Sequence, residues 1–244
     1  MVVFISLVGV VALVVVHLFS GKLRFLEGNP RSVWLSMAGG VSVAYVFVHL
    51  LPELGEGQEV IAEAVGQDLS FLEKHVYLIA LLGLAVFYGL ERLAATSRRR
   101  QREAMRKDST SAGVFWLHIS SFALYNALIG YLLLHRLVSG LQALVLFSVA
   151  MALHFVVNDY GLREHHKDLY RRIGRWLVSV TIFAGWLVGL VVELPEAAIA
   201  ALTAFLAGGV VLNVLKEELP EEQQSRFWAF ALGAALYAAL LLAL

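Results

Sequence analysis

Eight apolar runs restrict this chain to a fold that crosses a membrane. Each run is about the 20 residues that a helix needs to span roughly 30 Å of hydrocarbon. The runs lack the alternation of barrel strands, which indicates helices. With 59% hydrophobic residues, the chain is also far more apolar than a soluble domain. We therefore expect an all-α integral membrane protein with a single transmembrane domain over residues 1–244 and helices at 2–19, 33–54, 75–95, 113–135, 137–159, 175–193, 195–216 and 226–244.

The first apolar run directly follows Met1, without a basic segment before it or a small-residue cleavage site before Lys22. This pattern favours a retained helix over a cleaved signal sequence. The sequence contains no cysteine. Disulfide bonds, thiolate zinc sites and thiol redox chemistry are therefore excluded.

The basic residues predict the orientation in the membrane. If all eight runs cross it, 17 of the 19 Lys and Arg residues fall on one side, and only Lys74 and Arg136 fall on the other. By the positive-inside rule that side is cytoplasmic and both termini lie outside. Residues 96–112 are expected to be a basic cytoplasmic loop that sets topology beside the lipid bilayer rather than binding nucleic acid. We expect the inner membrane of a prokaryotic cell.

The fourth and fifth runs carry polar side chains that lipid-facing helices normally avoid: His118, Asn126, His154, Asn158 and Asp159. Such groups are costly to bury in a membrane, so they usually face the bundle interior and mark a pathway or site. The alternative is that they hydrogen-bond across helices and only hold them together.

His118 and His154 lie at matching depths in these two runs. At ~1.5 Å per residue, both imidazoles lie about 8 Å from the cytoplasmic ends of their helices, so we expect them to meet. Together with Asp159 they would form a weak divalent-metal site or a proton relay. Asn126 and Asn158 are the further candidate metal ligands.

Two expected loops contain further titratable groups. The loop after residue 159 holds the adjacent His165 and His166, which on a helix would point about 100° apart and cannot chelate one ion. A plain cytoplasmic turn is the favoured interpretation, and a pH-responsive or weakly metal-binding pair is the alternative. On the outer side, the expected loop over residues 55–74 is acidic, and it predicts a short helix on the membrane surface. His49 and Glu53, four apart, form a candidate site where a cation would first bind.

Two segments indicate an internal repeat. Residues 38–41 and 207–210 both read Ala-Gly-Gly-Val, and residues 51–53 and 219–221 both read Leu-Pro-Glu. The first set lies in the second helix and the other in the seventh, which would run in opposite directions. This pattern is typical of transporters with inverted repeats, although Ala, Gly, Val and Leu are abundant in any apolar helix.

In topology and in residues 38–54 and 207–221, the chain resembles the ZIP family of divalent-metal transporters. The resemblance implies eight helices in a 3+2+3 inverted-repeat bundle and a metal path between the fourth and fifth helices. It also implies Zn²⁺ or another divalent metal as the transported substrate, and it indicates no certain cofactor.

The chain departs from the family in its fourth helix. The family's His-Asn-x-Pro-Glu-Gly corresponds here to residues 125–130, which read Tyr-Asn-Ala-Leu-Ile-Gly. Asn126 is kept, whereas Ile129 replaces the Glu. A dication in hydrocarbon needs anionic partners, and Ile129 supplies none.

The fifth helix departs as well. The family's His-Glu-x-Pro-His-Glu-x-Gly-Asp corresponds to residues 154–162. His154 is kept and Asp159 can stand in for the second Glu, but Asn158 replaces a His and is a weaker ligand.

The leading hypothesis is therefore a ZIP-like transporter, not an enzyme, with its path between the fourth and fifth helices. The alternative is a transport-inactive relative with a structural or sensing role. An intramembrane zinc hydrolase, with zinc on His118, His154 and Asp159, is a weaker third hypothesis. A homodimer is compatible with all three.

Overall fold

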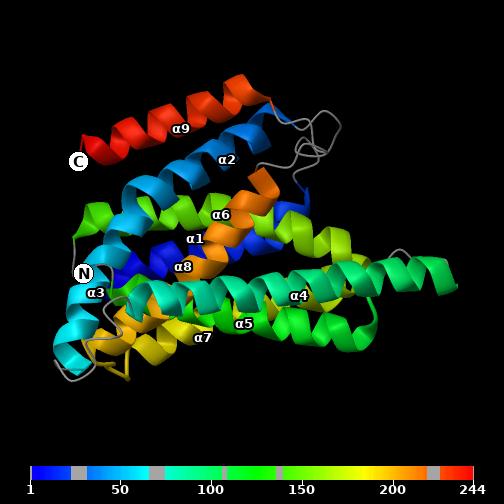
Figure 1. Cartoon of the computed structure of the whole chain (residues 1–244), viewed down its shortest axis with the longest axis horizontal. Coiled ribbons are helices and arrows are strands. Elements are labelled where there is room, and N and C mark those ends of the chain that lie inside the picture. Colours follow the sequence, from blue (N-terminus) through cyan, green and yellow to red (C-terminus); the bar gives the residue numbers. More distant parts are fainter. Residues whose placement is uncertain are drawn as a thin grey trace. The chain divides into compact units, whose positions relative to one another are not determined.

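The computed structural model describes residues 2–22, 32–65, 75–105, 109–135, 140–218 and 226–243 (Figure 1). Every regular element in these residues is helical, which confirms the all-α prediction. The α-helices are α1 (Val2–Phe19), α2 (Val33–Tyr45), α3 (Leu51–Val65), α4 (His75–Met105), α5 (Ala112–His135), α6 (Leu141–Leu169), α7 (Arg175–Gly189), α8 (Glu196–Glu218) and α9 (Phe227–Leu242). A 3-10 turn, η1 (Ser20–Lys22), follows α1, and the π-helical turns η3 (Val46–Leu50) and η6 (Tyr170–Gly174) follow α2 and α6.

The helices have the length and apolarity of membrane spans. Six described segments qualify: Val3–Lys22, Val33–Ala64, His75–Ala104, Ala112–His135, Leu144–Gly189 and Glu196–Lys216. Phe227–Leu242 is apolar but shorter. Large apolar side chains such as Phe4, Leu124 and Val180 lie on the surface. A lipid surrounding explains them, because water would not favour so many.

Two helices continue where loops were expected. α4 runs through residues 96–105, which belong to the expected basic loop; residues 106–108 lie outside the described part. This stretch is rich in the helix formers Arg, Gln, Glu and Ala, and Arg99 Nε lies 4.0 Å from Glu103 Oε1 one turn later. Likewise α2, η3 and α3 form one helical stretch over residues 33–65, where a break after residue 54 was expected.

Lys167 interrupts the regular helix near the end of α6. Its backbone has φ 47° and ψ −116°, a conformation that residues with a Cβ rarely adopt. The π-helical turn η6 follows almost immediately. The expected loop over residues 160–174 is therefore largely helical, with a sharp kink inside it.

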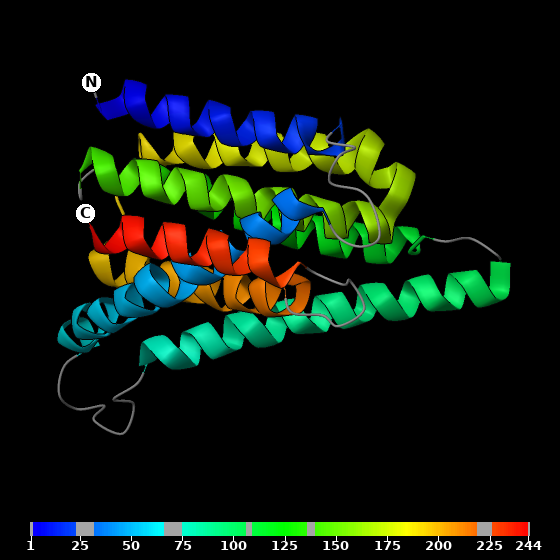
Figure 2. The same ribbon diagram turned by 90° about the horizontal axis from the view of Figure 1, so that it is seen from above.

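The chain divides into two compact units. Unit 1 comprises Met1–Arg24 and Gly89–Glu193, and there α7 packs along α5. In the same unit α1 packs against α6 and α7, and Figure 2 shows α1 beside α7. Unit 2 comprises Phe25–Tyr88 and Leu194–Leu244, and there α2 packs along α9 and α3 against α8. The helix α4 begins in unit 2 and ends in unit 1.

Glycines bring two helices of unit 1 into backbone contact. Gly130 on α5 faces the backbone of Ile182 and Trp186 on α7, and Gly185 on α7 faces the carbonyl oxygen of Ala127. A Cβ at either glycine would overlap these backbone atoms. The close approach of α5 and α7 therefore requires glycine at both positions.

The same register joins two helix pairs of unit 2. In each pair, one helix has a glycine that faces a carbonyl oxygen of the other helix. That oxygen belongs to the residue three positions before a glycine of the second helix. The pairs are Gly40 with Gly233 (α2 with α9) and Gly208 with Gly83 (α8 with α4). Gly208 follows Gly40 by 168 residues, as Pro220 follows Pro52. The glycine contacts and the Leu-Pro-Glu segments thus share one sequence offset, although residues 219–221 lie outside the described part.

Candidate functional site

A buried polar network lies inside unit 1, where α1, η1, α5, α6 and η6 meet. We call it the central network: His17, Ser20, Asn126, Asp159 and Tyr170. His17 Nδ1 lies 2.9 Å from Asp159 Oδ1, and His17 Nε2 lies 2.7 Å from Asn126 Oδ1. His17 and Asp159 are each only 1% exposed. The network therefore holds an ionisable pair inside an apolar bundle.

Hydrogen-bond directions determine the protons on His17. Asn126 Nδ2 donates a 2.8 Å bond to the Phe122 carbonyl, so the amide oxygen faces His17 and can only accept. His17 Nε2 must therefore carry a hydrogen. On the other side, Nδ1 lies 2.9 and 3.1 Å from the two Asp159 oxygens. Nδ1 can donate to that carboxylate when it carries a hydrogen.

Asp159 accepts from further donors. Ser20 Oγ donates to Oδ2 at 2.8 Å, and the Tyr170 hydroxyl donates to Oδ1 at 2.6 Å. A carboxylate in an apolar interior is tolerated only when it is paired and hydrogen-bonded. The central network meets both conditions, so Asp159 can remain ionised beside His17.

His154 and Asn158 lie near this network on α6. His154 Nε2 lies 3.2 Å from the Tyr125 hydroxyl of α5. Asn158 is buried, and its Nδ2 has no hydrogen-bond partner among the described residues. His154 thus connects α6 to α5 through Tyr125, which stands where the ZIP motif quoted above has its His.

A second group, the inner histidine cluster, joins α4, α5 and α6: Glu91, Thr110, His118, His165 and His166. His166 Nδ1 lies 2.6 Å from Thr110 Oγ1, and its Nε2 lies 2.9 Å from His118 Nδ1. His118 Nε2 lies 3.2 Å from Glu91 Oε1, within ion-pair range but without the alignment of a hydrogen bond. His165 Nε2 lies 3.6 Å from Glu91 Oε2.

The structure corrects two expectations here. His118 and His154 do not meet, because His118 contacts His166 and Glu91 whereas His154 contacts Tyr125. Nor do His165 and His166 form an exposed turn. His166 is 1% exposed, because α6 continues past Asp159 and carries this imidazole into the bundle.

Five residues of these groups were not predicted from the sequence: His17, Ser20, Glu91, Thr110 and Tyr170. His17 is the only ionisable residue between residues 2 and 19, and a lone intramembrane imidazole is itself a signal for a site. The sequence indicated Glu91 and Tyr170 less clearly as site residues, because Glu91 lies near the end of a span and Tyr170 lies in an expected loop.

The structure describes no group of three or more His, Asp or Glu side chains that could hold a metal ion. The five candidate metal ligands do not lie together in the structure. Asn126 and Asp159 belong to the central network, His118 belongs to the inner histidine cluster, and His154 and Asn158 lie outside both. In this arrangement the groups are suited to holding and exchanging protons, which imidazoles and carboxylates do readily.

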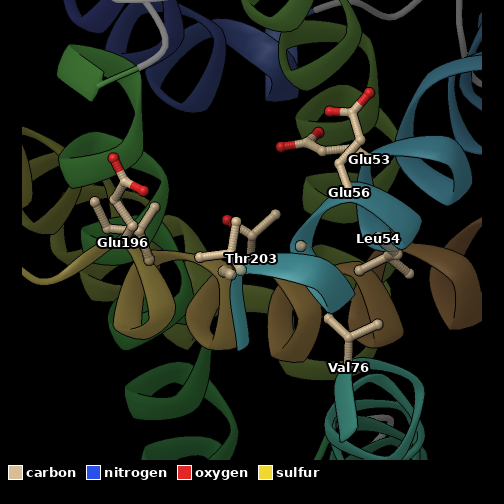
Figure 3. A pocket seen from close by; sticks show the side chains of 10 residues that line it. Glu53, Leu54, Glu56, Val76, Glu196 and Thr203 are labelled. Carbon is tan, nitrogen blue, oxygen red and sulfur yellow. The ribbon is translucent and has the colours of Figure 1, made fainter. Parts of the chain in front are cut away.

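His49 and Glu53 lie in unit 2, in η3 and α3. His49 Nε2 is 3.9 Å from Glu53 Oε2. Glu53 and Glu56 line a cavity of about 240 Å³ together with Glu196 of α8. Figure 3 shows Glu53 and Glu56 on one side of this cavity, with Thr203 between them and Glu196. Of the two residues predicted to bind a cation first, Glu53 thus lines this acidic cavity.

Compared with known proteins, the chain matches no protein-family model and no curated protein.

Proposed function

We propose that the chain is a ZIP-like membrane transporter whose cation path follows the facing sides of α5 and α6 in unit 1. The central network carries this proposal. Asp159 and His17 are almost fully buried between helices that are otherwise apolar, and ionisable groups inside a membrane usually mark substrate or proton pathways. His154 with Tyr125 extends the polar surface along the same two helices.

Helix lengths support eight passages through the membrane. The segment Leu144–Gly189 has 46 residues, or about 69 Å of helix at ~1.5 Å per residue, more than twice the ~30 Å of hydrocarbon. The kink at Lys167 divides it into two passages, α6 and α7. With the short apolar α9 as the last passage, the count is eight.

The composition of the units supports the 3+2+3 inverted repeat. Numbered as passages, unit 1 contains the first, fourth, fifth and sixth, and unit 2 contains the second, seventh, eighth and the start of the third. The inverted repeat relates the first passage to the sixth, the second to the seventh and the third to the eighth. Both passages of each pair belong to the same unit, apart from the end of the third. The two glycine pairs of unit 2 also correspond under this relation.

The transported substrate in this proposal is a divalent metal cation such as Zn²⁺. We place the protein in a prokaryotic inner membrane with both termini outside, in accord with the distribution of basic residues. The ZIP resemblance supports this substrate class, and the acidic cavity beside His49 and Glu53 supplies the negative charge that attracts cations.

Flux measurements test the proposal. Purified protein in liposomes should carry Zn²⁺, Mn²⁺ or Fe²⁺ down an imposed gradient, and Asp159→Asn should reduce the rate at least tenfold. Asp168→Asn is the matched control, because Asp168 is exposed and pairs with Arg171 at the surface. Equal rates for the wild type and Asp159→Asn would remove Asp159 from the path. Absence of flux for every cation would contradict transport itself.

One observation favours a second candidate function, that of a transport-inactive relative with a structural or sensing role. Both oxygens of Asp159 already accept hydrogen bonds, so a cation would have to displace protein donors. Calorimetry distinguishes the candidates. If neither Zn²⁺, Mn²⁺ nor Fe²⁺ binds at neutral pH and no flux occurs, the inactive relative is the better description.

A further inference from the structure

The acidic cavity of unit 2 has an apolar floor. Its apolar lining comes from three helices, with Leu54 of α3, Val76 of α4 and Ile199 of α8. Leu54 and Val76 are 3% and 0% exposed, so they form the deep part of the lining. The Val76 backbone N–H donates a 3.0 Å hydrogen bond to Gln58 Oε1, which holds the start of α4 against α3. The cavity therefore offers an apolar surface on which the body of a ligand can lie.

Acidic side chains border the cavity on two sides. Figure 3 shows Glu53 and Glu56 on one side and Glu196 on the other. Glu56 and Glu196 are exposed, and among the described residues no basic side chain pairs with either of them. Glu53 has His49 at 3.9 Å. Carboxylates are negatively charged at neutral pH, so the cavity favours a cation.

The Thr203 hydroxyl is a second and independent indication of a ligand. Thr203 is only 9% exposed, and it lines the cavity between the two acidic sides (Figure 3). Its hydroxyl has no hydrogen-bond partner in the part of the chain that the structure describes. A threonine within a helix commonly donates to the carbonyl one turn earlier, and a buried polar group without a partner is costly. A ligand that hydrogen-bonds Thr203 would remove this cost.

These features fit an organic cation better than a metal ion. In the described part of the chain, the acidic side chains do not converge as ligands of one metal ion. A hydrated metal ion would gain nothing from the apolar floor. An organic ammonium group can donate three hydrogen bonds to oxygen atoms around it, and its apolar body is stabilised when it covers apolar surface.

The volume of the cavity limits the size of that body. The cavity measures about 240 Å³, whereas an apolar cavity of roughly 150 Å³ is enough to hold benzene. The additional volume accommodates a short chain and an ammonium group beside one ring. Larger amines would extend out of the cavity.

We propose that this cavity binds a primary organic ammonium ion about the size of phenethylammonium. The ammonium group lies between Glu56 and Glu196 and donates to Thr203 Oγ1, and the ring lies against Leu54 and Val76. This site goes beyond the proposed function, because a ligand can bind here whether or not the chain transports metal ions.

Isothermal titration calorimetry of the full chain in detergent micelles tests the site, with empty micelles as the blank. The probes are phenethylamine, which is charged at pH 7, and 2-phenylethanol, which has the same ring and chain but no charge. We expect saturable binding of the amine, and binding of the alcohol that is weaker by about tenfold or more. Equal affinities for the two probes, or no saturable binding of the amine, would overturn the proposal.

Substitutions in the cavity locate the binding. Glu56→Gln combined with Glu196→Gln removes two charges and should weaken amine binding by about tenfold or more. Thr203→Val keeps the shape of the side chain but removes the hydroxyl, and it should weaken binding by about threefold to tenfold. Thr203→Ser keeps the hydroxyl and should retain the affinity. Glu103→Gln is the matched control, because Glu103 is exposed beside Arg99 on α4, and it should leave the affinity unchanged.

The amine site is contradicted if neither the double glutamine variant nor Thr203→Val changes the affinity. If the double variant fails to fold, 0.5 M NaCl replaces it, because salt screens exposed charges and should weaken amine binding to the wild type. An affinity that does not depend on salt would then overturn the proposal.

A metal ion is the competing occupant. ZnCl₂ that binds more tightly than the amine, and loses this binding in the double glutamine variant, would make the cavity a metal site and overturn the proposal. Transport is a separate result. Amine binding without metal flux contradicts the proposed function alone, and metal flux without amine binding contradicts the amine site alone.

Discussion

The Tyr170 hydroxyl donates a 2.6 Å hydrogen bond to Asp159, eleven residues earlier in the chain. In a straight α-helix these residues would be about 16 Å apart along the axis. The kink at Lys167 lies between the two residues, and it changes the direction of the chain before Tyr170. The bond therefore links the central network to the end of α6, where His166 enters the inner histidine cluster.

Removing this hydroxyl should weaken the fold. Tyr170→Phe leaves the ring in place but takes one donor from a buried carboxylate, which should cost about 1.5–3 kcal/mol of unfolding free energy. Denaturant titration in mild detergent measures it. Tyr88→Phe is the control, because Tyr88 is exposed and should lose less than about 0.5 kcal/mol. Equal effects of the two substitutions would show that the bond to Asp159 contributes nothing.

His17 and Asp159 should behave as a coupled pair. Removing one partner leaves the other charge buried, so His17→Leu or Asp159→Leu should each cost about 3–5 kcal/mol. The double variant should cost clearly less than the sum, because it leaves no unpaired charge. The half-exposed pair His49 and Glu53, 3.9 Å apart, should show a coupling below about 1 kcal/mol. Additive losses at His17 and Asp159 would contradict the pairing.

Alanine should be poorly tolerated where helices meet at glycine. Gly130→Ala and Gly185→Ala place a Cβ against backbone atoms of the facing helix, so each should lower the unfolding free energy by about 1–3 kcal/mol or more. Gly89→Ala is the matched control within α4, because a Cβ there meets no atom within 4 Å. The control should be neutral or slightly stabilising, and a similar loss in all three variants would exclude packing as the cause.

The kink at Lys167 should store strain that glycine relieves. Lys167→Gly removes the Cβ from an unfavourable backbone conformation and should gain about 1 kcal/mol. The exposed pair with Glu164 is lost, but such pairs contribute little. Lys167→Ala loses the same pair while keeping its Cβ, so it should show no gain. Thermal unfolding of both variants compares them, and a gain in Lys167→Ala would refute the role of strain.

Much of the fold could be predicted because it depends on local properties. Apolar run length predicts helices, and the described helices overlap all eight expected runs. Helix ends were less predictable. Arg99 and Glu103 belong to a charged stretch that reads as a loop, yet it has high helix propensity and extends α4.

The site could be predicted only in part. Asn126 and Asp159 could be predicted to be buried because each is a polar residue in an apolar run. That inference requires only the sequence of the helix that carries the residue. Their shared partner His17 lies more than 100 residues away, and helix rotation decides which side chains meet. His166 illustrates the limit, because it is buried only through the continuation of α6 past Asp159, where the polar residues 160–169 indicated a loop.

The glycine contacts have a consequence for how this sequence can vary. Main-chain atoms of three helix pairs approach one another closely at six glycines: Gly40, Gly83, Gly130, Gly185, Gly208 and Gly233. Main-chain atoms are common to all residues, so these helix contacts restrict the identity of few surrounding side chains. The lipid-facing residues can change freely as long as they stay apolar. Such a bundle can keep its architecture while its sequence drifts away from that of any relative.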